Sequence, residues 1–444
     1  MHEFEIVIES CGLLEQAGGV QLHRDVSAGK VSFLPLGRWR GTLQQEDLPY
    51  NFIKLTDSID FLGVTLKATF VQTRKANCDS MEEKIKKVVG PWKGGKFMWV
   101  TQRGHSANCY AFSKIFHRCA SIPLREDTIA CITSQVRSWV LQDFFQKPAA
   151  AVLHRKPLEG GLGLYCVKLR ALALLLRTFC ELACTPGFRH SLQLEILFRT
   201  QVLGETWPAP PPLPPYYNEE FFNILRHYHL NSSFNVCSMK VKDWYNVLLW
   251  DKVTHSPSTT LSPGALLPVR AELAQPEVNW PTTWRRARLS GLPSDLTSHL
   301  FRQLHDVLPL QTRVARLGGS RGPRHQGVCR LCTADVQEDA MHAFFSCTYN
   351  KEAATTLLRH VQRLLESNIN PEAALYLSFE TEPASELAVT LLLAAGFKLL
   401  WDQRVSNKST SRVQMTAELS ARTRILAGCS KFAGTVAKLQ LALT

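Results

Sequence analysis

The first seventy residues of the chain have the residue pattern of β-strands. VSFLPLG (31–37) and IDFLGVTL (59–66) are rich in β-branched and aromatic residues, and glycine and proline stand between them. Residues of the first kind favour a pleated surface, whereas glycine and proline mark turns. The sequence therefore predicts a small β-sheet near its N-terminal end.

From about residue 80 the spacing of apolar residues changes to that of helices, because they recur three and four positions apart. The same spacing continues after Cys347 to the end of the chain. We therefore expect a mostly α fold with a small N-terminal β element, in the α+β class. The clearest helical stretches are MEEKIKKVV (81–89), SANCYAFSKIFHRCA (106–120), EDTIACITSQVRSWVLQDFF (126–145) and the leucine- and alanine-rich run after Lys168.

Proline and glycine interrupt this helical pattern in three places. WPAPPPLPPYY (207–217) has six prolines in eleven residues, which excludes a helix or a central strand. It is interpreted as a stiff spacer, and a docking site for a proline-recognising protein is the alternative. HSPSTTLSPGALLPV (255–269) is a second loop-like stretch. LEGGLGLY (158–165) suits a turn, and it lacks the preceding strand and following Lys-Ser/Thr of a phosphate-binding loop.

Composition adds a charge imbalance and argues against secretion. The 444 residues include 51 Lys and Arg against 38 Asp and Glu, a formal charge of +13. This excess favours an anionic partner, although a solvated cationic face is the alternative. Thirteen cysteines, scattered along a chain without a signal peptide, fit a reducing compartment. The apolar stretches 169–183 and 384–401 contain charged residues, so we expect no membrane span and an intracellular protein of the nucleus or cytoplasm.

One cluster of cysteines departs from this scattered pattern. CRLCTADVQEDAMHAFFSC (329–347) places Cys329, Cys332, His342 and Cys347 within nineteen residues. Four soft or borderline ligands at this spacing predict one closed, tetrahedral, structural zinc site. We expect 337–346 to form a short helix that presents His342. A chance cluster or a redox pair is the alternative, but a redox pair needs a surrounding βαβ pattern and leaves His342 and Cys347 unused.

Two basic stretches predict contacts with RNA or DNA. Between residues 284 and 324, eight arginines face only two aspartates, and guanidinium groups bind phosphate oxygens in two-point contacts. Upstream, 84–110 interleaves cations with aromatic residues, a combination that suits a single strand with stacked bases. For each aromatic residue, a place in a helix core is the alternative. Residues expected to bind from these stretches are Lys93, Lys96, Arg285, Arg286, Arg288, Arg313, Arg316 and Arg321.

Six stretches in order resemble the reverse transcriptases of non-LTR (LINE-type) retrotransposons, in the half that follows the polymerase centre. The resemblance implies that Phe61, Leu62 and Gly63 belong to a primer-gripping hairpin, and that Arg103, Gly104 and Asn108 lie on a thumb helix. The stretches are FEIVIESCGLLEQAGGVQLHRDVSAGK (4–30), FLGVTL (61–66), VTQRGHSANCYAFSKI (100–115), RSWVLQDFF (137–145), GGLGL (160–164), and LHDVLPLQTRVARLG (304–318) with the cysteine cluster after it.

The sequence lacks residues that this family uses in its polymerase centre. The family's polymerase centre holds two magnesium ions on carboxylates that include an adjacent Asp-Asp pair, and no such pair occurs in this sequence. In the first stretch, His23 and Val26 stand where the family commonly has Asn and Lys. The resemblance therefore assigns no proton-donating lysine to the position of Val26. Magnesium is expected only in the parent polymerase.

The resemblance implies a nucleic-acid-binding fragment, not an enzyme by itself, which in the parent protein would hold template RNA, primer and target DNA during target-primed reverse transcription. One alternative is part of an active polymerase whose palm is supplied upstream or by a partner; another is a domesticated scaffold that binds proteins. The implied segments are a palm edge (1–70), a helical thumb (71–206), a proline-rich linker (207–217), a connector (218–283), a basic zinc-binding module (284–350) and a helical tail (351–444).

Overall fold

The computed structural model describes most of the chain from residue 53 onward and short pieces before it. Three sequence-based expectations fall outside the described residues: the first family-like stretch (4–30), most of the proline-rich segment (208–216), and the second loop-like stretch (255–269). Leu62, Lys96 and Arg321 also lie outside them. The described residues are 31–34, 44, 46, 53–61, 63–93, 98–142, 147–183, 189–207, 217, 219–231, 236–254, 275, 277–316, 327–332, 336–428 and 430–444.

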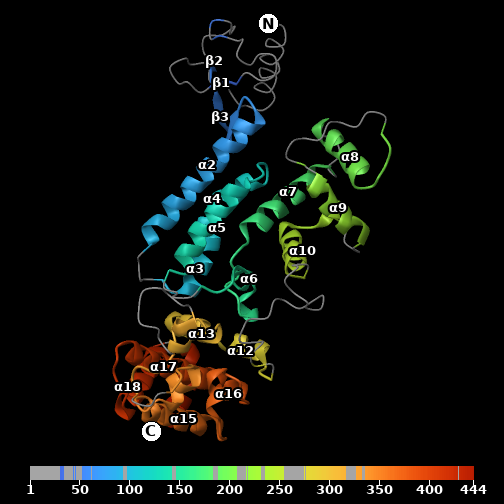
Figure 1. The fold of residues 1–444 in the computed structure, drawn as a ribbon. Helices are drawn as coiled ribbons and strands as arrows, with labels where there is room; N and C mark the ends of the chain where they lie inside the picture. Colours follow the sequence, from blue (N-terminus) through green and yellow to red (C-terminus); the bar gives the residue numbers. More distant parts are fainter. Residues whose placement is uncertain are drawn as a thin grey trace. The chain divides into compact units, whose positions relative to one another are not determined.

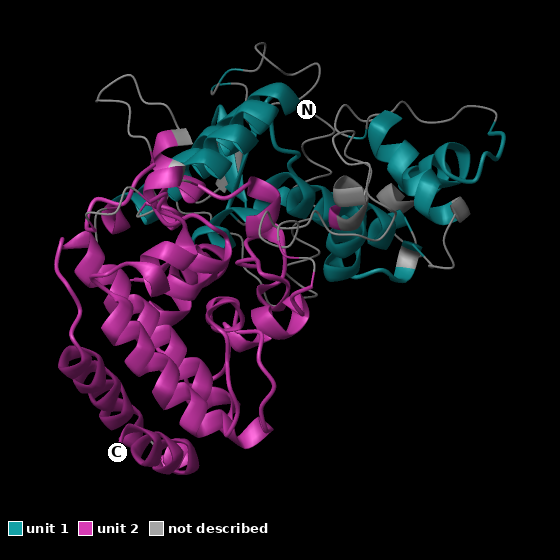
Figure 2. Ribbon diagram, turned by 60° about the horizontal axis from the view of Figure 1, so that its bottom comes forward, with its two compact units in different colours: residues 1–90, 111–135, 167–248 teal, residues 91–110, 136–166, 249–444 magenta. Residues whose placement is uncertain are grey.

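Helices dominate the described residues, and the strands are confined to the N-terminal part, which confirms the expected fold class (Figure 1). Clustering of contacts divides the chain into two units, coloured separately in Figure 2. Unit 1 comprises residues 1–90, 111–135 and 167–248, and unit 2 comprises 91–110, 136–166 and 249–444. The units interleave along the sequence, so their limits differ from the boundaries that the sequence predicts.

Unit 1 begins with two small strand pairs and continues as helices. Strands β1 and β2 are parallel, with Val31 opposite Ile53, and β3 and β4 form an antiparallel hairpin, with Phe61 opposite Val64. The strands are β1 (Val31–Phe33), β2 (Ile53–Leu55), β3 (Ser58–Phe61) and β4 (Val64–Lys67). The helices are α2 (Phe70–Val89), α4 (Ser113–Cys119), most of α5 (Glu126–Val140), α7 (Val167–Ala183), α8 (Arg189–Gln201), α9 (Glu219–Asn231) and most of α10 (Val241–Thr254).

The hairpin is fixed to helix α2 by a buried asparagine. Asn77 is 0% exposed; its Oδ1 accepts the Thr65 N–H at 3.0 Å, and its Nδ2 donates to the Thr65 carbonyl at 2.7 Å. Thr73 Oγ1 accepts the Lys67 N–H at 2.8 Å. Because both partners are backbone groups of β4, the hairpin keeps a fixed orientation on α2.

Unit 2 contains the remaining helices, including all of those after residue 280. They are α3 (Val100–Ser106), the π-turn η5 (Ala107–Ala111), α6 (Ala150–His154), η6 (Pro157–Glu159), α12 (Trp280–Arg286), α13 (Ser294–Leu304), α14 (Gln311–Arg316), the π-turn η8 (His342–Ser346), α15 (Lys351–Leu365), α16 (Pro371–Leu375), α17 (Pro383–Val405), α18 (Arg412–Ala427), η9 (Ser430–Phe432) and α19 (Ala433–Leu443).

One hydrophobic core runs through these C-terminal helices. It joins residues from α12 and α13, from the cysteine-containing segment, and from α15 to α19, such as Trp284, Phe344, Leu357 and Leu419. The zinc module and helical tail expected from the sequence therefore share a single core. Helix α17 lies in it and is, among the described residues, one helix long and apolar enough to cross a membrane; 78% of its apolar window is buried inside the structure.

Candidate metal centre and nucleic-acid interface

The four residues chosen from sequence spacing come together in the structure. Their ligand atoms lie within 4.8 Å of one another, and all four residues are buried. Cys329 Sγ lies 3.9 Å from Cys347 Sγ, and Cys332 Sγ lies 3.4 Å from His342 Nε2. With usual zinc bond lengths, a tetrahedral site requires about 3.8 Å between two sulfurs and about 3.6 Å between sulfur and nitrogen. The cluster thus fits a four-coordinate metal, and 3.9 Å is too long for a disulfide.

A tight turn holds the first cysteine pair. Val328 forms an antiparallel bridge with Gln337, and the Cys329 N–H donates to the Val336 carbonyl at 2.9 Å. Gly327 begins this turn with φ +77°, and a Cβ there would lie 2.7 Å from Gln337 Oε1. Only glycine meets both conditions without strain. The sequence-based expectation of a helix over 337–346 is thus wrong at its start, because Gln337 pairs with Val328.

A π-turn, η8, presents the other two ligands. The His342 N–H donates to Asp339 Oδ1 at 2.7 Å, and the Cys347 N–H donates to the His342 carbonyl at 2.8 Å. The wider turn brings His342 and Cys347 to the same side, whereas a regular helix would rotate them apart. Phe344 of the same turn packs against Phe397 of α17 with ring centroids 5.3 Å apart, which joins η8 to the C-terminal core.

Local hydrogen bonds and burial shift the thiols in opposite directions. Burial raises the pKa of Cys329, but the N–H groups of Cys332 and Leu331 and the His342 side chain together lower it to about 6. Burial raises the pKa of Cys347 to about 12. The three thiols and the imidazole titrate as one coupled group, and a bound cation would favour the thiolate form of the cysteines near neutral pH.

The family-like residues of α3 and η5 are engaged inside unit 2. Arg103 is 1% exposed, and its Nε donates to the Val140 carbonyl at 3.0 Å. A Cβ built on Gly104 would lie 3.4 Å from Leu162 Cβ. Asn108 Nδ2 donates to the Gly163 carbonyl at 2.8 Å, and its Oδ1 accepts the Tyr165 N–H at 3.0 Å. Gly104 and Asn108 thus face the glycine-rich turn (158–165), whereas Arg103 joins α3 to the end of α5.

Two arginines of the basic stretch, Arg286 and Arg288, are also bonded within the protein. Arg286 is 5% exposed; its Nε donates to Glu386 at 2.9 Å, and its Nη1 donates to the Leu377 carbonyl at 2.7 Å. Arg288 Nη2 donates to the Gly161 carbonyl at 2.9 Å, and burial lowers the Arg288 pKa to about 10. The expectation that Arg286 and Arg288 face a phosphate backbone is corrected here, because both are bonded within the protein.

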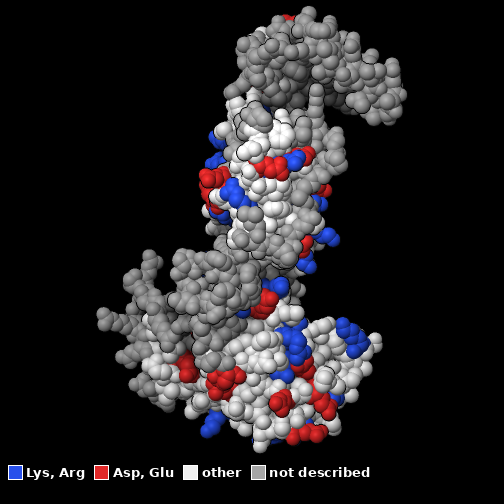
Figure 3. Space-filling model, turned by 90° about the vertical axis from the view of Figure 1, so that its right-hand side faces the viewer, with Lys and Arg blue, Asp and Glu red and all other residues white. Residues whose placement is uncertain are grey.

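Arg285 differs from these two arginines by its exposure. Its side chain is 49% exposed while it contacts Glu386 through Nη1 at 2.5 Å. Arg313 and Arg316 lie on α14, and their side chains are outside the described part of the structure. Nucleic acid contact remains a prediction for these three. On the face drawn in Figure 3, cationic and anionic side chains lie interspersed, so the net charge does not produce a surface of one sign there.

The hairpin of unit 1 carries an exposed aromatic residue beside several cations. Phe61 is 62% exposed at the end of β3. Gly63 turns the chain with φ +79°, and a Cβ there would lie 3.1 Å from His117 Nε2 of α4. Desolvation lowers the pKa of Lys84, and Arg118 and Lys114 lower it further, while the Asp60 carboxylate of the hairpin raises it, so Lys84 lies near two cations and one anion. We call Phe61, Gly63, Lys84, Lys114 and His117 the hairpin cluster.

Sequence reasoning missed Lys114 and His117 in this cluster. The two residues are three apart on α4 and therefore share a helix face, which the sequence does show. Nothing in the sequence pairs that face with the hairpin, about fifty residues earlier.

Lys93, another residue expected to bind nucleic acid, is exposed in unit 2. The neighbouring Trp92 packs against Trp139 with ring centroids 5.0 Å apart, and against Tyr110, which is 60% exposed.

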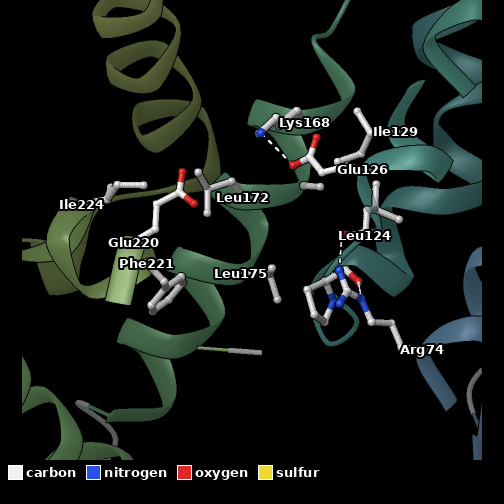
Figure 4. Close-up of a pocket in the computed structure, with 12 residues that line it drawn as sticks. Arg74, Leu124, Glu126, Ile129, Lys168, Leu172, Leu175, Glu220, Phe221 and Ile224 are labelled. Atoms are coloured by element: carbon white, nitrogen blue, oxygen red, sulfur yellow. Dashed lines mark hydrogen bonds and ion pairs between the residues drawn. The ribbon is translucent and has the colours of Figure 1, made fainter. Parts of the chain in front are cut away.

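A hollow of about 390 Å³ lies within unit 1 between α2, α5, α7 and α9 (Figure 4). Lys168 and Glu126 face each other at its rim, 2.7 Å apart, and Arg74 donates to the carbonyls of Pro123 and Leu124. Leu172, Leu175 and Phe221 supply apolar surface. The charged groups thus tie helices together, and the hollow lacks a nucleophile with a neighbouring base.

Comparison with known proteins leaves the family resemblance without independent support. No family model matches the chain, and no curated protein matches it.

Proposed function

We propose that this chain is a sequence-tolerant binder of single-stranded RNA or DNA, a non-catalytic part of a non-LTR reverse transcriptase. The hairpin cluster is the observation that carries this proposal. Phe61 offers a flat apolar surface on which a base can stack, and Lys84 and Lys114 offer charges for the phosphates on either side. Asp60 compensates only part of the positive charge around Lys84, so an anionic ligand would stabilise the remaining cations.

We also propose that the metal of the Cys329, Cys332, His342 and Cys347 cluster is zinc with a structural role. Three thiolates and one imidazole suit zinc, and four protein ligands leave no open position for catalysis. In this proposal the metal pins the segment that carries the ligands to the C-terminal core. One zinc per chain, found by elemental analysis of the purified protein, would support it, and a protein without metal would refute it.

Binding of a fluorescent single-stranded RNA at a series of salt concentrations tests the nucleic acid proposal. We expect affinity to fall steeply with salt, because each phosphate contact contributes a slope of about −0.7 in log K against log salt for single strands. In K84Q/K114Q the slope should be shallower by about 1.4. Phe61→Ala should weaken binding by about 1–3 kcal/mol with the slope unchanged.

The matched control is K75Q/K86Q, which removes the same number of positive charges from unit 1, both from α2. Lys75 and Lys86 are exposed on α2, about 180° and 200° around the helix axis from Lys84. We expect the control to keep most of the salt dependence of the unmodified chain. Equal losses in both double variants would show that only net charge matters and would contradict a site at the hairpin cluster, as would undetectable or salt-insensitive binding.

A further inference from the structure

Helix α17 reaches the metal cluster through Arg404. This residue lies near the end of α17, and its Nη2 donates to Cys329 Sγ at 3.6 Å. The Arg404 side chain is 7% exposed. A cationic N–H donor at a sulfur stabilises the thiolate and fixes its direction, which is the usual task of groups in the outer shell of a metal site.

Glu338 holds the Arg404 guanidinium in place. The Glu338 side chain is 1% exposed and forms an ion pair with Arg404 Nη2, while its Oε1 accepts the Arg404 Nε–H at 3.2 Å. The same Oε1 accepts the Gln311 N–H of α14 at 3.2 Å. Glu338 is bonded by its own N–H to the Gly327 carbonyl at 2.8 Å, in the turn that begins the cluster. A buried pair with these additional bonds has a defined geometry.

A second buried contact joins the other pair of ligands to the loop after α17. Asn350 is 0% exposed; its Nδ2 donates to the Ala343 carbonyl inside η8 at 2.9 Å, and its Oδ1 accepts the Thr410 hydroxyl at 3.4 Å. Both halves of the cluster are thus bonded to residues around the C-terminal end of α17. An autonomous zinc finger has no such dependence on a helix outside its own segment.

We propose that Arg404 is a positioning residue for the metal ligand Cys329, and that metal binding and the packing of α17 are one coupled event. This inference rests on the proposed metal site. Coupling of this kind is reciprocal: if α17 strengthens metal binding, bound metal stabilises α17 by the same free energy.

The first test compares the metal affinity of the full chain with that of R404M/E338Q, which removes the donor without leaving a buried charge. Affinity is measured by competition with a chromophoric chelator, and the thiolate-to-cobalt absorption band is recorded after loading with Co²⁺. We expect affinity to fall by about 10–100-fold and the band to shift. An affinity and a band equal to those of the unmodified chain would overturn the proposal.

The control is R422M/D295N, which removes another ion pair of the same unit, 3.0 Å long, that does not touch the cluster. It should lower the melting temperature while metal affinity and the cobalt band stay unchanged. A matching loss of affinity in the control would show general destabilisation and would also overturn the positioning role.

A second measurement uses the unmodified chain and so does not depend on whether a variant folds. Chelation of the metal should speed amide hydrogen exchange in residues 383–405 of α17 as well as in 327–347. Faster exchange confined to 327–347 would overturn the coupling. If the unmodified chain binds no metal at all, the metal proposal itself fails, whereas normal metal binding with unchanged α17 exchange refutes this inference alone.

Discussion

Two segments were predicted to be functional because residues of one type are dense in them: the cysteine-containing segment (329–347) and the arginine-rich segment (284–324). The structure supports the predicted contacts in the first segment and replaces part of them in the second. The four metal-ligand candidates converge within 4.8 Å. Arg286 and Arg288, by contrast, lie inside the protein and bond to Glu386 and Gly161. A metal site needs several ligand atoms of particular types, so the spacing of cysteine and histidine in the sequence is enough to predict it. Whether an arginine is buried or binds a phosphate depends instead on partners that are distant in sequence.

The sharpest way to break this comparison is to remove one metal ligand. C347S should reduce metal affinity by at least about 100-fold and lower the free energy of unfolding by several kcal/mol, because structural zinc contributes directly to folding. C180S is the matched control, since Cys180 is equally buried, belongs to unit 1, and is not one of the four candidate ligands. Metal titration and thermal melting check both, and retained stoichiometric binding in C347S would refute the ligand assignment.

The prediction for the arginine-rich segment is tested by comparing how much stability is lost when the buried Arg286 or its exposed neighbour Arg285 is replaced. R286M should destabilise the protein by about 3–5 kcal/mol, because it leaves the Glu386 carboxylate with less compensation in a largely buried position. R285Q should cost about 1 kcal/mol or less, since half of the Arg285 side chain is exposed.

The double variant R286M/E386Q completes this experiment, measured by urea denaturation. It should recover much of the stability lost in R286M, because neither charge is then buried alone. If R286M instead left stability unchanged and weakened RNA binding, Arg286 would face the nucleic acid as first expected from the sequence.

A more gradual effect, spread over several pH units, is expected from the buried His299 of the arginine-rich segment. Desolvation lowers the pKa of His299 to about 3, with Arg302 and Lys398 adding to the shift. In the unfolded chain, a histidine binds its proton near pH 6.5. Between pH 6.5 and 3 the unfolded state therefore binds more protons, so stability falls as pH falls, by up to about 1.4 kcal/mol per pH unit for this residue.

The variant H299L should remove this part of the pH dependence. Urea denaturation of H299L and of the unmodified chain at several pH values isolates it, because the contribution of the metal ligands is common to both and cancels in the difference. H105Q, at an exposed histidine, should leave the slope unchanged. Parallel stability curves for H299L and the unmodified chain would contradict the assignment.

Sequence could predict those features that neighbouring residues determine. The β3–β4 hairpin follows from IDFLGVTL, and α7 from the spacing of its apolar residues. The four candidate metal ligands could be predicted, because cysteine and histidine are the residue types that bind zinc. The π-turn η8 could not be predicted, because Asn350, which bonds to its Ala343 carbonyl, is itself bonded to Thr410, 60 residues later in the chain. Contacts such as Glu338 with Arg404, 66 residues apart, have no local signal at all.

The enclosure of α17 also has a consequence for synthesis of the chain. Its apolar residues pack on α15, which precedes it, and on α18 and α19, which follow it. At Gly396 the contact with α15 is so close that a Cβ would lie 2.4 Å from Leu357 Cδ2. Until the ribosome has released α18 and α19, one side of this 23-residue apolar helix has no partner. Nascent chains therefore present, for a short time, a segment of the kind that chaperones and membrane-targeting factors recognise.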